Sequence, residues 1–378
     1  MKKFRHITRI TSLFIASTFM LIVLTGTAKS DEKIKVVATF SILGDMVKRI
    51  GGDHILLTTL VGPNGDTHVY KPSPAAAKAL SQADVLFVNG LDFEGWITRL
   101  IEASGFKGRH VVTTSGVKTI AYEEGEGHDD HSDDPHDKHA KKKHADDKHH
   151  DDHSDDPHDK HAKKKHADDK HHDDHSDDPH DKHAKKKHAG DKHHDDHAHH
   201  DHGEFDPHAW QSLINARVYV DNITDALAQF APDKAAKFYQ NRATYTAEIE
   251  SMHNQIKKLI SSLPQHQRTV VTSHDAFQYF GRDYGITFLA PQGLSTDSEA
   301  SAQNVAKLIE QMRTKKIKAV FLENITDPRL LQQIAKETGA KIGGTLYPGA
   351  LSEPDGPAPT YLKMLHHNAK TLSQALGS

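Results

Sequence analysis

The sequence predicts an α/β protein with two four-stranded parallel-sheet lobes, joined by one long rigid helix and carrying a disordered histidine-rich insertion. Three observations support this prediction. β-rich runs alternate with helical runs in both halves of the chain, which is typical of parallel sheets flanked by helices. One apolar stripe with helical spacing lies between Pro232 and Pro264. A tract made almost only of His, Asp, Lys and Ala, residues 128–202, interrupts the first half.

The first half alternates between runs that favour strands and runs that favour helices. The expected strands are residues 35–42, 55–61, 84–89 and 110–114, and the expected helices are residues 44–50, 74–82 and 93–103. Residues 84–89 are apolar in an unbroken run, as in a strand covered by helices on both faces. A loop signal, Gly62-Pro-Asn-Gly65, follows the second strand.

A single long helix is expected between the two halves. Residues 209–230 favour a helix, and Pro232 then suits the first position of another, where its missing N–H would be unpaired anyway. Apolar residues follow at spacings that mark one helical face; they are Phe238, Tyr245, Ile249, Met252, Ile256 and Leu259. A helix of about 30 residues spans roughly 45 Å, so residues 232–263 can join two lobes as a rigid strut.

The second half repeats the alternation of the first. The expected strands are residues 269–273, 286–290, 319–323 and 341–346, and the expected helices are residues 276–284, 298–314, 329–338 and 360–376. We therefore predict a first lobe over residues 31–231, which contains the tract, and a second lobe over residues 264–378.

The first 30 residues have the features of a secretory signal. A basic start (Lys2, Lys3, Arg5 and Arg9) precedes a short apolar run, residues 13–24, and Ala28-Lys-Ser30 suits cleavage. An uncleaved anchor is the alternative. The chain has no cysteine, which excludes disulfides and thiolate ligands. The signal leads us to expect an exported, periplasmic protein, and the lack of cysteine leads us to expect no lipid anchor.

The histidine-rich tract is a repeat with a period of 22 residues, starting at His128, His150 and His172. It holds 23 of the 33 histidines in the chain. A tract this polar has no apolar surface to bury, so we expect it to be disordered. Neutral imidazole is a common zinc ligand, which makes a flexible metal-collecting arm our hypothesis. A charged spacer with incidental histidines is the alternative.

Three other histidines lie where open parallel sheets hold their ligands, beyond the carboxyl ends of strands. His68 follows the second expected strand, His274 ends the strand at residues 269–273, and His208 stands at the entrance of a helix. Three neutral imidazoles plus one further ligand make a tetrahedral zinc set. Hydrogen-bonded structural histidines are the alternative. Outside the signal and the tract the chain is nearly neutral, which gives no support for nucleic-acid binding.

Several motifs resemble those of the zinc and manganese solute-binding proteins of ABC transporters, the cluster A-I or TroA-like group. They are Gly65-Asp-Thr-His68 with Tyr70, Asn89-Gly-Leu-Asp-Phe-Glu-Gly-Trp96, Asp206-Pro-His-Ala-Trp210, Thr272-Ser-His-Asp-Ala-Phe277 and Gly343-Gly-Thr-Leu-Tyr347. The likeness covers residues 34–125 and 203–378. It implies two α/β lobes joined by a long helix, with the metal held between them.

The resemblance also implies the ligands, the metal and the partners. His68, His208 and His274 match the three histidine ligands, and a histidine at position 274 points to zinc, since manganese members usually have a carboxylate there. A membrane permease and a cytoplasmic ATPase would be the partners of a monomeric binding protein. Zn²⁺ would be transported cargo, and the protein would not be an enzyme.

One position departs from the family pattern. Many members place an aspartate ligand where this chain has Gly349, which cannot coordinate through a side chain. The fourth ligand is then water, Glu353, Asp355 or a histidine of the tract.

Three other functions stay open. One is a zinc buffer or chaperone without a permease, and another is a manganese-binding homologue. The third is a zinc hydrolase, because a three-histidine site with an open position resembles a catalytic centre. Its candidate bases are Glu204, Asp206, Asp275 and Glu323. Asp206 could instead set the turn before His208, and Glu323 could instead hydrogen-bond a ligand histidine.

Overall fold

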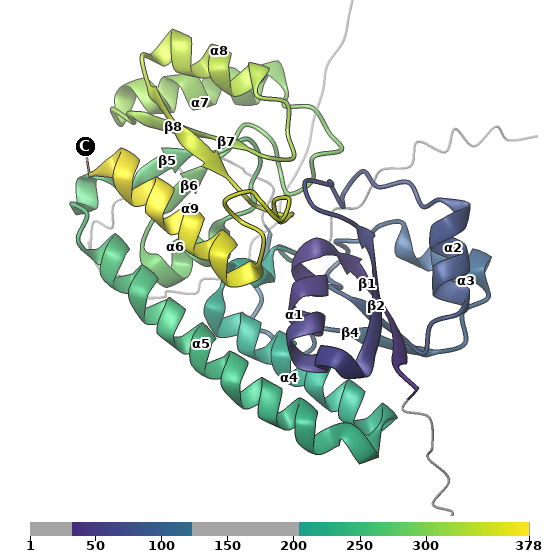
Figure 1. Cartoon of the computed structure of the whole chain (residues 1–378). Coiled ribbons are helices and arrows are strands. Elements are labelled where there is room, and N and C mark those ends of the chain that lie inside the picture. The colour runs from purple at the N-terminus through teal and green to yellow at the C-terminus, as the bar shows by residue number, and fades with distance from the viewer. Residues whose placement is uncertain (1–31, 123–203, 378) are drawn as a thin grey trace, which may run out of the picture. The chain divides into compact units, whose positions relative to one another are not determined.

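Two four-stranded parallel sheets organise the chain (Figure 1). The computed structural model describes residues 32–122 and 204–377, which all belong to one compact unit. The expected signal peptide and the histidine-rich tract lie outside the described residues. The predicted α/β class with two four-stranded lobes is confirmed. No helix in the described ranges is both long and apolar enough to cross a membrane.

The first sheet has the strand order β2-β1-β3-β4, and all its pairings are parallel. Its elements are β1 (Ile34–Phe40), α1 (Ser41–Gly51), β2 (Ile55–Val61), α2 (Pro74–Ser81), β3 (Val85–Val88), α3 (Ile97–Ser104) and β4 (Arg109–Val112). Every residue of β3 is buried, which agrees with its unbroken apolar run. In this order the chain changes direction between β1 and β3, the kind of switch point where open α/β sheets bind ligands.

The second sheet repeats this topology as β6-β5-β7-β8. Its elements are β5 (Thr269–Val271), α6 (Gln278–Tyr284), β6 (Thr287–Leu289), α7 (Ala302–Thr314), β7 (Ala319–Glu323), α8 (Arg329–Thr338), β8 (Lys341–Leu346) and α9 (Tyr361–Leu376). Its switch point lies between β5 and β7. The two halves therefore share one topology without a repeat in sequence.

Two helices connect the sheets, α4 (Leu213–Phe230) and α5 (Ala235–Ser261). They pack side by side, and α5 also contacts α1 and α9 (Figure 1). With 27 residues, α5 is roughly 40 Å long. Its buried residues include Phe238, Tyr245, Ile249 and Ile256, as the apolar stripe predicts. It starts three residues after Pro232, because a short 3₁₀ turn (Pro232–Lys234) comes first.

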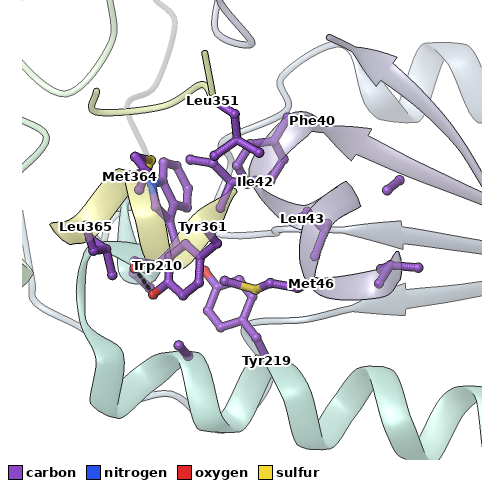
Figure 2. Packing of buried hydrophobic residues seen from close by; sticks show 14 of the residues in the cluster. Phe40, Ile42, Leu43, Met46, Trp210, Tyr219, Leu351, Tyr361, Met364 and Leu365 are labelled. Atoms are coloured by element: carbon purple, nitrogen blue, oxygen red, sulfur yellow. Dashed lines mark hydrogen bonds between the residues drawn. The ribbon is translucent and has the colours of Figure 1, made fainter. Parts of the chain in front are cut away.

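The hydrophobic core joins residues from both halves of the chain. Figure 2 shows Ile42 and Met46 of α1, Tyr219 of α4 and Tyr361 of α9 in one cluster. The Tyr361 hydroxyl donates a 2.5 Å hydrogen bond to the carbonyl oxygen of Trp210. A smaller cluster lies among β5, β7, α7 and α8. The last helix thus packs into the core of the first lobe and ties the end of the chain to it.

Several helices begin later than the sequence patterns predict, and capping explains two of these differences. Ser212 accepts a hydrogen bond from the backbone N–H of Asn215, so α4 starts at Leu213 after a 3₁₀ turn rather than at residue 209. Ser301 accepts one from Asn304, so α7 starts at Ala302 rather than at residue 298. A side chain that accepts such a bond satisfies an otherwise unpaired N–H and fixes the helix start.

Candidate metal centre

The structure brings His68, His208 and His274 together from three separate segments. One ring nitrogen of each lies within 4.8 Å of one ring nitrogen of the others. His68 stands in the loop after β2, His208 just before the 3₁₀ turn Ala209–Gln211, and His274 three residues beyond the end of β5. His208 and His274 are fully buried, and His68 is partly buried.

The spacing of the ring nitrogens fits a small divalent ion. The Nε2 atoms of His68 and His208 are 3.3 Å apart. Two nitrogens on a tetrahedral zinc ion, each about 2.0–2.1 Å from it, would be about 3.3–3.4 Å apart. The three rings are tilted or edge-on to one another, with centroids 5.3–5.7 Å apart. This arrangement allows the lone pairs of three nitrogens to point at one centre.

His208 is held by Asp206 at two points. Asp206 Oδ1 lies 2.8 Å from His208 Nδ1 and accepts a 2.9 Å hydrogen bond from the His208 backbone N–H. Burial, together with nearby His274, lowers the pKa of His208 well below its usual value. Burial also raises the pKa of Asp206 to about 7. His208 is therefore kept neutral, the state that a metal ligand requires.

His274 is held in the same way by Glu323, the last residue of β7. Glu323 Oε2 lies 2.6 Å from His274 Nδ1, and Oε1 accepts hydrogen bonds from the backbone N–H groups of Ser273 and His274. Burial opposes protonation of His274, but the charge and hydrogen bond of Glu323 outweigh it and raise the pKa of His274. His274 Nε2 is buried and has no hydrogen-bond partner among the described residues. Such an atom is suited to bind a ligand.

His68 is positioned by its own loop and by the second lobe. Its backbone N–H donates a 3.0 Å hydrogen bond to Asp66 Oδ1. Asp66 Oδ2 accepts a 2.5 Å hydrogen bond from Thr296 Oγ1, which belongs to the loop after β6. The ring of Phe93 meets the His68 ring edge-on at 4.8 Å. Burial raises the pKa of Asp66.

The other residues considered as ligands or bases lie outside this cluster. No carboxylate among the described residues joins the group of the three histidines. Glu353 and Asp355 are both exposed, and Gly349 has no side chain to offer. The histidines of the tract lie outside the described residues.

None of the four residues considered as the base of a hydrolase joins the cluster of the three histidines. Asp206 and Glu323 each contact a histidine Nδ1. Asp275 accepts a 2.6 Å hydrogen bond from Gln278, and burial raises its pKa to about 6. Glu204 is exposed, and its carbonyl oxygen accepts a hydrogen bond from the backbone N–H of Tyr122.

Two features of the site were not assigned from sequence, although one had a visible signal. The spacing Asp-X-His occurs twice, in Asp66-Thr-His68 and Asp206-Pro-His208. In both, the aspartate accepts a hydrogen bond from the backbone N–H of the histidine. This repeated spacing could have identified Asp66 as a positioning group. The contact of Phe93 with His68 had no such signal, because it depends on the backbone of an irregular loop.

Comparisons with known proteins agree with this fold. The sequence model of the family described as "Zinc-uptake complex component A periplasmic" matches residues 36–375. The chain is 26% identical over 346 residues to the iron-binding protein YfeA of Yersinia pestis, covering 92% of this chain and 87% of the relative. It is 27% identical over 376 residues to the manganese-binding lipoprotein MntA of Bacillus subtilis, covering 96% and 98%.

A solved structure also resembles this one. The periplasmic zinc binding protein TroA of Treponema pallidum superposes with a TM-score of 0.68 at 23% identity, covering 91% of this chain and 99% of that protein. This likeness supports the fold, and the family match covers almost the whole chain. The chain therefore belongs to the family of the periplasmic component A of the zinc-uptake complex, whose members are metal-binding solute-binding proteins of ABC transporters and not enzymes.

Proposed function

We propose that the protein captures Zn²⁺ at His68, His208 and His274 and delivers it to an ABC permease. The observation that supports this most strongly is the convergence of three histidine nitrogens within 4.8 Å. Two of the rings have a carboxylate at Nδ1, which leaves Nε2 available to the ion. Carboxylates that orient ligand histidines in this way are common in zinc sites.

Zinc is our choice of metal because the cluster offers only imidazole nitrogens. Manganese sites favour carboxylate, carbonyl and water oxygens, whereas imidazole suits zinc. The 23 histidines in the tract add the same preference. A manganese or iron cargo is the second candidate, since two relatives are named for those metals.

We propose water as the fourth ligand. Gly349 has no donor side chain, and the exposed Glu353 and Asp355 would have to leave solvent to reach the ion. A fourth position filled by water also suits release, because water exchanges without rearrangement of the protein. A carboxylate or a histidine of the tract remains the alternative donor.

The tract would raise the local concentration of zinc near the three histidines. Single imidazoles bind zinc weakly, but many on one tether keep the ion close. Ala121 and Phe205, on either side of the tract, pair as an antiparallel bridge in the structure. The described segments on either side of the tract therefore lie next to each other.

We propose a monomer that is exported to the periplasm by a cleaved signal over residues 1–30. The relative MntA is named a lipoprotein, which argues for a lipid anchor in part of this group. This chain has no cysteine, so we propose that it is not anchored through one. A buffer or chaperone without a permease is the remaining alternative for its role, and uptake of zinc by cells separates the two.

Single substitutions of the three histidines test the site. Structural zinc sites bind with about 10–16 kcal/mol, or about 3 kcal/mol per ligand, so each of His68→Ala, His208→Ala and His274→Ala should weaken zinc binding about 100-fold. The measurement is competition for zinc with a chromophoric chelator. His266→Ala, an exposed histidine, is the matched control. Equal affinity in all four variants and the wild type would contradict the assignment.

A further inference from the structure

A buried carboxylate, Glu94, lies in the loop that packs against the metal centre through Phe93. Glu94 is 3% exposed and follows β3 in a short loop. It accepts three hydrogen bonds, from the hydroxyl of Thr39 at 2.5 Å and from the backbone N–H groups of Asn89 at 2.7 Å and Gly90 at 3.1 Å. The carboxylate therefore joins the end of the loop to its start at Asn89 and Gly90, and joins the loop to Thr39 of β1.

The loop that Glu94 closes has an unfavourable backbone. Gly90, Leu91 and Asp92 have φ angles of 88°, 55° and 57°. Left-handed conformations are disfavoured for residues with a Cβ, and three in succession need support from their surroundings. The hydrogen bonds to Glu94 hold the first two residues of the loop and so provide that support.

This loop contacts the metal centre at two points. The ring of Phe93 lies edge-on to His68 at 4.8 Å and 6.0 Å from the ring of His208. The side-chain amide of Asn89 donates a 2.9 Å hydrogen bond to the carbonyl oxygen of Pro207, the residue before His208. Tyr219 donates a hydrogen bond to the other end of that amide and fixes its orientation.

We infer that Glu94 is a positioning residue of the metal centre, which holds the loop of residues 89–94 so that Asn89 and Phe93 fix two of the three histidines. This inference rests on the proposed function. It explains why a carboxylate stands there, since all three partners are donors. A glutamine would turn its own N–H₂ group toward at least one of them and leave donors unpaired in a buried place.

The test is zinc binding by full-length Glu94→Gln, with Glu102→Gln as the matched control. Glu102 is an exposed glutamate of α3, so the control makes the same chemical change outside the loop. We expect Glu94→Gln to weaken zinc binding about tenfold. We also expect it to change the visible absorption of bound Co²⁺, which reports the geometry of the ligands. Glu102→Gln should match the wild type in both.

A purely structural role for Glu94 predicts a different result. Glu94→Gln would then unfold at lower urea, while its zinc affinity and its Co²⁺ spectrum equalled those of the wild type, and this outcome would overturn the inference. If Glu94→Gln does not fold, Phe93→Leu replaces it as the test. That variant keeps an apolar side chain but removes the ring, so it should weaken zinc binding and change the Co²⁺ spectrum; unchanged values would overturn the inference.

The same titration separates this inference from the proposed function. The triple variant with alanine at His68, His208 and His274 retains the tract. Its zinc binding therefore measures binding outside the three-histidine site and is subtracted from that of the other chains. If the wild type does not exceed this triple variant, the proposed function fails. If the wild type exceeds it and Glu94→Gln equals the wild type, only the positioning role fails.

Discussion

The carboxylate of Glu323 holds His274 by both its ring and its backbone. Oε2 lies 2.6 Å from the ring Nδ1, and Oε1 accepts a 3.2 Å hydrogen bond from the backbone N–H. Glu323 is the last residue of β7, and His274 lies three residues beyond β5. The two residues come close because β5 and β7 pair in parallel. Because Nδ1 donates to the carboxylate, the tautomer is fixed and the Nε2 lone pair is free for an ion.

Replacement of Glu323 should weaken metal binding without removing a ligand. Glu323→Gln keeps the shape but loses the charge that increases the basicity of the ring, so we expect zinc affinity to fall about 10–100-fold. Competition with a chelator measures the change. Glu310→Gln, an exposed glutamate of α7, is the control. An unchanged affinity in Glu323→Gln, measured at a pH above the pKa of His274, would contradict this role of Glu323.

Zinc affinity should also depend on pH through His274. Burial disfavours its protonated form, but the charge and hydrogen bond of Glu323 outweigh this and raise the pKa of His274 above 6.5. A protonated imidazole cannot bind zinc, so affinity should be full above this raised pKa and fall as the pH drops through it. In Glu323→Gln burial dominates, and the fall should move to lower pH. Chelator competition from about pH 8 to about pH 5 measures both midpoints; identical midpoints contradict this account.

An added carboxylate at position 349 should strengthen the site. A Cβ on Gly349 would meet only Ile325 Cδ1, at an ordinary 3.5 Å, and the glycine has no positive φ. The fold therefore has room for Gly349→Asp. Because the family resemblance places an aspartate ligand at this position, we expect zinc affinity to rise about tenfold, or about 1.4 kcal/mol. Gly349→Asn, which lacks the charge, is the control. Unchanged zinc affinity in Gly349→Asp, with the fold intact, would place this loop away from the ion.

Deletion of residues 128–202 should leave the three-histidine site intact. The deletion is compatible with the fold, because Ala121 pairs with Phe205 and the Tyr122 N–H donates a 3.0 Å hydrogen bond to the carbonyl oxygen of Glu204. We expect one zinc ion per shortened chain, several per full chain, and less than about a twofold change in affinity at the three-histidine site. Metal analysis and chelator competition measure these values.

Uptake by cells then separates the transport role from the buffer role. A transport protein without its tract should lose function mainly at scarce zinc. Loss of function at all zinc concentrations would favour a buffer whose main binding site is the tract.

Much of the fold could be predicted from local patterns. The bounds of β2, β7, β8 and α8 agree with the sequence, because apolar runs and helical periodicity mark them clearly. The predicted start of α3 at residue 93 is wrong. That residue lies in a loop that contains positive φ angles, and the helix begins at Ile97. Leu91 and Asp92 gave no sign of that backbone, which their side chains alone do not favour.

The site was predictable in part. His68, His208 and His274 could be selected because each follows an expected strand or precedes a helix, and the structure brings them together. The contact of Asp66 with Thr296 joins residues 230 positions apart and depends on how the lobes meet. The role of Glu94 was equally hidden, because its partners are mainly backbone N–H groups. Local sequence patterns do not encode such long-range or backbone contacts.

The most direct test of the central claim is anomalous diffraction at the zinc edge, from crystals of the protein loaded with one equivalent of Zn²⁺. Our account predicts one strong peak about 2.0–2.1 Å from a ring nitrogen of each of His68, His208 and His274. A strongest peak at any other position, or none near these three residues, would contradict it.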